Sequence, residues 1–130
     1  MLVIALALAL GNSASDLPAT STFDDQAFCA QMRASAARDD TRPGTIIDRT
    51  TTHGGVFVDC DRRLVDMRTM LGRPVTKAWL RAQQRYWGDD MCAEPAVSEA
   101  TSNGWKVTAT IVANGKTIAI FEARCPDVSR

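Results

Sequence analysis

The chain has 130 residues, the length of a single domain, and 45% of them are apolar, which is enough for one modest core. Its 15 Lys and Arg residues balance its 15 Asp and Glu residues, so no overall field attracts nucleic acid or an anionic membrane. These values argue against tandem domains and against a nucleic-acid-binding protein, and any charged partner must recognise a local patch.

The N-terminus has the pattern of a secretory signal peptide. Its first ten residues, MLVIALALAL, form an uncharged apolar run about half as long as the roughly 20 residues of a membrane-spanning helix. Ser13 and Ser15 follow with the spacing of a signal-peptidase site, although no Lys or Arg precedes the run. An N-terminal helix folded into the domain is the alternative. We predict a periplasmic or secreted protein with no integral membrane segment after cleavage, divided into a signal peptide (1–15), a flexible segment (16–22) and one domain (23–130).

All four cysteines lie beyond the predicted cleavage site, at Cys29, Cys60, Cys92 and Cys125. An even number of cysteines in an oxidising compartment indicates two disulfides. The separations of 31, 32 and 33 residues between successive cysteines lack the close pairs of a zinc site. We therefore expect no metal site and no cofactor.

A faint internal repeat favours one of the three possible disulfide pairings. The segments CAQMRASAA (29–37) and CAEPAVSEA (92–100) share Cys, Ala, Ser and Ala at the same offsets, and a predicted hairpin follows each. Each hairpin closes on the next cysteine, which predicts sequential pairing of Cys29 with Cys60 and of Cys92 with Cys125. Small residues dominate the matches, so the other two pairings stay open.

The first half of the domain is predicted to be a helix near residues 23–38 and a three-stranded meander over residues 45–71. The meander segment is rich in threonine and β-branched residues. Gly54-Gly55 is expected to break the first pair of strands, and CDRR (60–63) to turn the second. His53 would then lie in a hairpin loop.

A central helix is predicted over residues 72–90, with Pro74 in its first turn and Gly88 at its stop. Asp89 and Asp90 would then mark the helix end, and Cys92 would follow as a tether. On a helical wheel one apolar stripe is predicted to face the core: Val75, Trp79, Ala82 and Tyr86, with Leu80 and Trp87 beside it. The opposite side is predicted to carry a basic ridge: Lys77, Arg81 and Arg85, flanked by Arg73 and Gln84.

A shorter helical segment follows Cys92, and residues 105–125 are predicted to form a hairpin. Asn114-Gly115 suits a two-residue type I′ turn that pairs Ala113 with Lys116. Continuing this register places Phe121 on a mostly polar face. The opposite face is predicted to be core and consists of Trp105, Val107, Ala109, Ile111, Ile118 and Ile120.

The elements together predict an α+β fold. An antiparallel sheet of about five strands, made of the meander and the C-terminal hairpin, would pack on two or three helices and carry two disulfides.

No catalytic constellation is readable, so we expect no catalytic residue and no enzyme activity. The leading expectation is an exported binding or assembly protein whose partner is another envelope or secreted protein. The alternative is a binder of an anionic small molecule or glycan through the basic segment 62–85, with candidate residues Arg73, Lys77, Arg81 and Arg85. A third possibility, a small hydrolase, would require a concave site that gathers Asp59, Asp61 or His53.

Overall fold

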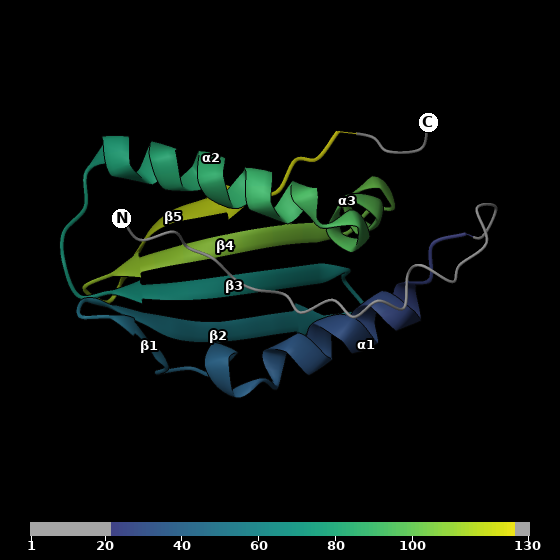
Figure 1. Cartoon of the computed structure of the whole chain (residues 1–130), viewed down its shortest axis with the longest axis horizontal. Helices are drawn as coiled ribbons and strands as arrows, with labels where there is room; N and C mark the ends of the chain where they lie inside the picture. The colour runs from purple at the N-terminus through teal and green to yellow at the C-terminus, as the bar shows by residue number, and fades with distance from the viewer. Residues whose placement is uncertain (1–21, 127–130) are drawn as a thin grey trace.

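The structure is a computed structural model that describes residues 22–126, so the signal peptide predicted over 1–15 and residues 16–21 of the flexible segment lie outside it. The described chain forms two layers, in which three α-helices lie on one face of a five-stranded sheet (Figure 1). An α+β fold with two disulfides is therefore shown.

The predicted order of elements is present along the chain. The elements are α1 (Asp25–Ala36), the 3-10 helix η2 (Asp39–Thr41), β1 (Ile46–Asp48), β2 (Thr51–Asp59), β3 (Leu64–Leu71), α2 (Lys77–Ala93), α3 (Pro95–Ser102), β4 (Lys106–Ala113) and β5 (Lys116–Glu122).

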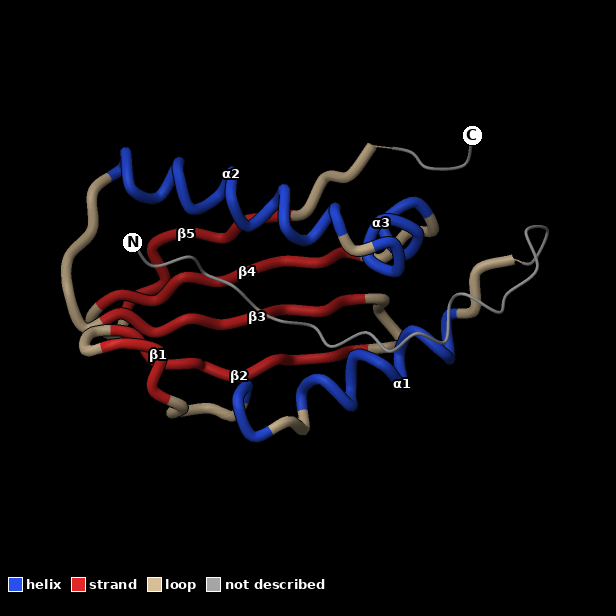
Figure 2. Tube along the Cα trace, in the orientation of Figure 1, coloured by secondary structure: helices blue, strands red, loops and turns tan. Residues whose placement is uncertain are grey.

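The sheet is mixed, which corrects the prediction of a fully antiparallel sheet. Its strand order is β1-β2-β3-β4-β5, and β3 and β4 are parallel whereas the other neighbours are antiparallel. The cause is the connection between β3 and β4: α2 and α3 carry the chain back along one face, so β4 starts at the end of the sheet where β3 starts (Figure 2). Strand composition alone does not show this return.

The first hairpin of the meander turns earlier than predicted. Asp48 Oδ1 accepts a hydrogen bond from the Thr50 N–H at 2.9 Å, and this Asx-type contact holds the turn between β1 and β2. Gly54-Gly55 lies inside β2, where the register against β3 shifts between His53 and Gly55. The glycines therefore form a β-bulge and do not break the strand pair, and His53 is a strand residue.

A second bulge corrects the predicted register of the C-terminal hairpin. Ala113 pairs with Lys116 as predicted, but Ile111 pairs with Ala119, which leaves Ile118 as an extra residue in β5. One extra residue moves every later side chain of the strand to the other face. Phe121 consequently lies in the core, and Ile120 is 65% exposed on the opposite face.

Helix α2 begins later and ends later than predicted. Thr76 is its N-cap, and the Thr76 hydroxyl oxygen accepts a hydrogen bond from the Trp79 N–H at 3.0 Å. The helix then continues through Gly88 to Ala93, because Met91 extends its buried stripe by one turn and this packing exceeds the roughly 1 kcal/mol that a mid-helix glycine costs. Asp89 and Asp90 are therefore exposed helical residues and not a helix end.

The buried face of α2 is also rotated from the predicted stripe. Gln83, Trp87 and Met91 are the buried residues of this helix, whereas Tyr86, predicted to be core, is 46% exposed. Trp79 and Leu80 flank the buried stripe and are partly buried against the core. The real stripe has the same helical period as the predicted one but is centred on Trp87.

The two disulfides fasten the helical layer to the sheet. Cys29 in α1 is bonded to Cys60 at the end of β2, and Cys92 in the last turn of α2 is bonded to Cys125 after β5. This is the sequential pairing that the internal repeat predicts. Between the layers lies a single cluster of buried apolar residues that includes Phe28, Met32, Val65, Met67, Trp87, Val97, Val107, Ile111 and Phe121.

Candidate binding face

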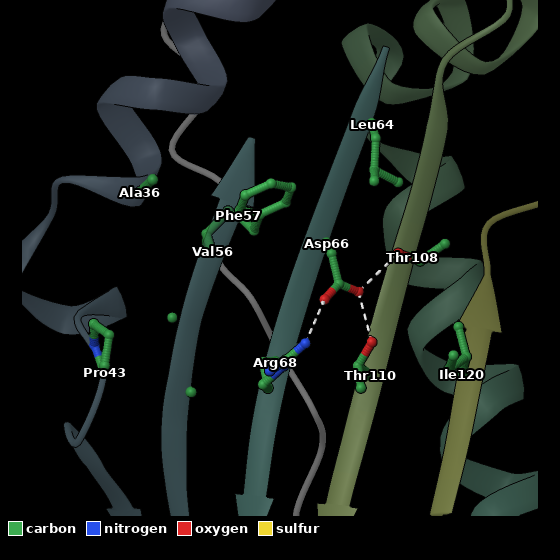
Figure 3. A pocket seen from close by; sticks show the side chains of 12 residues that line it. Ala36, Pro43, Val56, Phe57, Leu64, Asp66, Arg68, Thr108, Thr110 and Ile120 are labelled. Carbon is green, nitrogen blue, oxygen red and sulfur yellow. Dashed lines mark hydrogen bonds and ion pairs between the residues drawn. The ribbon is translucent and has the colours of Figure 1, made fainter. Parts of the chain in front are cut away.

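Within residues 22–126 the sheet face opposite the helices is open apart from one edge, where Ala36 at the end of α1 and Pro43 in the loop before β1 wall a hollow. The hollow, of about 670 Å³, lies over β2, β3 and β4 and reaches Ile120 on β5 (Figure 3). Two large apolar side chains stand on either side of it: Phe57 is 58% exposed and Ile120 is 65% exposed. Exposed apolar groups around a hollow are typical of a binding surface.

Strand alternation places the polar centre of this face. On β3 Val65 and Met67 point into the core, so Asp66 and Arg68 point to the open face. Parallel pairing then sets Asp66 beside Thr108 and Arg68 beside Thr110. Two rows of side chains cross the face as a result: Phe57, Asp66, Thr108 and Glu122 in one, and Gly55, Arg68, Thr110 and Ile120 in the other.

Asp66 is a polar group of the hollow that two hydroxyls hold in place. Its Oδ1 accepts hydrogen bonds from the hydroxyls of Thr108 at 2.7 Å and Thr110 at 2.8 Å. Its Oδ2 lies 3.8 Å from Arg68 Nη2, which is too long for a hydrogen bond (Figure 3). The carboxylate is thus fixed by one oxygen and 14% exposed, and its second oxygen can accept a hydrogen bond from a ligand.

The glycine bulge shapes the floor of the hollow. A Cβ atom at Gly54 would lie 2.5 Å from Arg68 Cγ, so glycine is what lets the arginine stem lie against β2. Gly55 has a φ of +95°, a conformation that residues with side chains rarely adopt. The pair that looked like a strand break in the sequence is therefore part of the candidate site.

The residues predicted to bind anions lie on the other layer. Lys77, Arg81 and Arg85 are exposed on α2 and have no ion pair within the described part of the chain. Arg73 is engaged elsewhere: its guanidinium carbon lies 4.9 Å from the centre of the Trp79 ring, and its Nε donates to Thr50 Oγ1 at 3.2 Å. Lys77, Arg81 and Arg85 are thus free cations on α2, whereas Arg73 is held by Trp79 and Thr50.

The remaining cations of segment 62–85 do not join this ridge. Arg62 and Arg68 each form an ion pair with a neighbour on the same stretch of chain, at 3.7 Å and 3.8 Å. Arg63 reaches across to Asp25 in α1 at 3.0 Å. The basic run in the sequence therefore becomes several separate contacts and not a single patch.

The residues proposed for a hydrolase do not meet in the hollow. Asp59 holds the turn between β2 and β3, since its Oδ1 accepts from the Arg62 N–H at 3.2 Å, and Asp61 is exposed beside it. His53 is buried in β2, and its Nδ1 has no hydrogen-bond partner in the part that the structure describes. Burial lowers the pKa of His53, and the charge of Asp40 opposes this in part. Among residues 22–126 no three His, Cys, Asp or Glu side chains are placed to hold a metal ion.

Sequence reasoning missed the centre of this face. A weak signal existed: Asp66 is the only acid between Arg62 and Arg85, and Thr108 and Thr110 lie on the polar side of the predicted hairpin. The parallel pairing of β3 with β4 was needed to bring them together across 42 and 44 residues.

Comparison with known proteins identifies the fold alone. No protein-family model and no curated protein matches this sequence. A solved structure from Pseudomonas aeruginosa, described as a "putative secreted protein", superimposes with a TM-score of 0.59 at 10% identity. The match covers 85% of this chain and 99% of that chain.

Two structural features bear on location. No helix among the described residues is long and apolar enough to cross a membrane. Two disulfides in one small domain are consistent with a periplasmic or extracellular location, where such bonds form and persist.

Proposed function

We propose that the protein is an exported, non-enzymatic binding or assembly protein that uses its open sheet face to dock on another exported protein molecule. One observation carries the proposal: Phe57 and Ile120 remain exposed on either side of Asp66, which the sheet itself holds in place. Aromatic and aliphatic anchors around a pre-ordered polar group are the usual energetic centre of a protein interface.

The rigidity of the face supports the same function. Its side chains stand on four hydrogen-bonded strands, and the hydroxyls that fix Asp66 come from the buried Thr108 and Thr110. Little side-chain ordering is then needed when a partner docks, which lowers the entropic cost of association. Truncating the anchor Phe57 should accordingly weaken binding by about 2 kcal/mol, or roughly 30-fold.

Site-specific photo-cross-linking in the exporting cell tests this function. A photo-reactive residue in place of Glu122, at the rim of the open face, should give a covalent protein adduct that disappears when Phe57→Ser is added. The matched control is the same photo-reactive residue in place of Arg81 on α2, which should give no such adduct. Absence of an adduct at position 122, or an adduct that Phe57→Ser leaves intact, would contradict the proposal.

A second candidate function, binding of an anionic small molecule or glycan, is favoured by the unpaired row of Lys77, Arg81 and Arg85. Side chains four residues apart lie about one turn apart along a helix, so the row can follow a linear polyanion. Retention on a sulfated polysaccharide should then fall with salt and be lost in the Arg81→Glu/Arg85→Glu variant. Retention that Phe57→Ser abolishes and the helix variant preserves would reject this candidate.

A further inference from the structure

We infer that the protein has a second binding site, separate from the open sheet face, for a small amphiphile that carries a carboxylate on an apolar chain. The site is a hollow of about 410 Å³ between the start of α2 and the turn that joins β4 to β5. Both elements lie at the same end of the two layers (Figure 1). The volume is within the range of small-molecule sites.

The strand register builds the hairpin side of this hollow. Ile111 points into the core, so Ala113, two residues further along β4, lies on the same face of the sheet, toward the helices. Lys116 pairs with Ala113 and therefore shares this face. Ile118, the extra residue of the β5 bulge, lines the same hollow and is exposed. The hairpin thus brings a cation and a branched apolar side chain to the start of α2.

The start of α2 supplies the other wall. Val75 precedes the N-cap, Leu80 lies in the first turns, and both line the hollow and are partly buried against the core. Lys77 lines it as well, three residues before Leu80 and hence on a neighbouring part of the helix surface. Pro74 completes this side. The lining is therefore mainly aliphatic, with a lysine on each side.

The charged groups of the hollow are both cations. Lys77 and Lys116 are exposed, neither forms an ion pair among residues 22–126, and no acid lines the hollow. Asn114 lines it too, and its side-chain amide can donate a hydrogen bond. A carboxylate accepts hydrogen bonds at both oxygens. Free donors beside aliphatic walls are therefore complementary to an anionic head on an apolar chain.

Other anionic partners fit this hollow less well. A polyanion would meet aliphatic walls where it needs polar partners, and the neighbouring cations Arg81 and Arg85 do not line the hollow. A bilayer surface requires several exposed apolar groups on one face, whereas Ile118 is the only large apolar side chain of this lining that is exposed. A single apolar chain that enters the hollow is the occupant that this lining favours.

Titration of the isotope-labelled, disulfide-bonded protein with sodium octanoate, followed by two-dimensional NMR, tests the inference. The backbone amide signals of Leu80, Lys116 and Ile118 should shift and saturate, with a dissociation constant in the millimolar range or below. Butanoate has a shorter chain and should bind at least about tenfold more weakly, because less apolar surface is buried. Octylammonium has the octanoate chain length with a positive head and should also bind at least about tenfold more weakly.

Variants of the lining identify the groups that bind. Lys77→Gln/Lys116→Gln removes both cations and should weaken octanoate binding at least about fivefold. Ile118→Ser should weaken it at least about threefold through the lost apolar contact. Lys106→Gln makes the same charge change at the other end of β4 and should leave the affinity unchanged. Thermal melts followed by circular dichroism identify any variant that does not fold, and the lysine variant, which alters only exposed side chains, decides if Ile118→Ser unfolds.

Three results would overturn the inference: shifts that do not saturate, equal affinities for octanoate and octylammonium, or an affinity that the lysine variant leaves unchanged. Shifts of the same signals with anionic phospholipid vesicles but not with octanoate would overturn it in favour of a membrane surface. The photo-adduct at position 122 is measured without octanoate, so the docking function of the open face stands or fails separately.

Discussion

Replacing Trp87 by Ala should produce the largest loss of stability among the aromatic residues of α2. The Trp87 side chain is 0% exposed, and its ring centre lies 6.3 Å from that of Phe121 across the layers. Its Nε1 has no hydrogen-bond partner in the described chain, so truncation removes packing and not a polar contact. The lost transfer energy and the cavity together should lower the free energy of unfolding by about 3 to 5 kcal/mol.

Matched replacements in the same helix test which face is buried. Trp79→Ala should cost only about 1 to 2 kcal/mol, because this ring is partly buried and Arg73 stacks on it. Tyr86→Ala should cost under about 1 kcal/mol and Arg81→Ala under about 0.5 kcal/mol, since both side chains are exposed. Urea unfolding followed by far-UV circular dichroism measures the four values with the disulfides intact. A loss for Trp79 or Tyr86 equal to that for Trp87 would refute the rotation of the buried stripe.

Three further predictions concern the covalent frame, pH and export. Replacing Cys92 and Cys125 together by Ala removes a disulfide that closes a loop with a sequence separation of 33 residues, so the free energy of unfolding should fall by about 3 to 4 kcal/mol. Non-reducing peptide mapping should still find the Cys29–Cys60 disulfide and no free thiol. Burial lowers the pKa of His53 in the folded chain, so the unfolded chain binds the proton more tightly, and stability should fall as pH drops from about 6.5 towards the folded pKa. His53→Gln should flatten this dependence, whose slope cannot exceed about 1.4 kcal/mol per pH unit, and an unchanged slope in denaturant titrations would exclude His53 as the cause. Intact mass spectrometry should show a mature protein that begins near Asp16, and a chain that keeps its first residue would contradict signal cleavage.

Features set by local chemistry were predictable from the sequence. The Asn114-Gly115 turn is one example: Asn114 has a φ of 50° and Gly115 a φ of 80°, the positive angles that a type I′ turn requires. The repeat likewise predicts the two bridges seen in the structure, because a helix followed by a hairpin returns the chain to its starting cysteine. The turn depends on two adjacent residues, and each bridge joins cysteines only 31 or 33 residues apart.

Features set by packing were not predictable in the same way. The run Ile118–Phe121 is apolar on both faces of its strand, so alternation does not choose between Ile120 and Phe121 for the core. The choice is made by Trp87, which packs against Phe121 from a helix more than thirty residues away. The same reasoning applies to α2. Met91 lies beyond Gly88 and is buried, so its packing stabilises a further helical turn, although a glycine in the sequence favours a helix end.

The candidate binding face combines both kinds of feature, and this explains why the acidic centre was missed. Asp66 is the only acid in a basic stretch of the sequence, and its hydrogen-bond partners come from a parallel strand that follows two helices. The disulfides lie at the ends of the layers, from α1 to β2 and from α2 to the segment after β5, and both leave the hollow free. The disulfides and the helices therefore stabilise the sheet from its core face. The opposite face keeps exposed apolar groups around a fixed carboxylate. A surface built in this way has the groups for recognition and little need to rearrange when a partner binds.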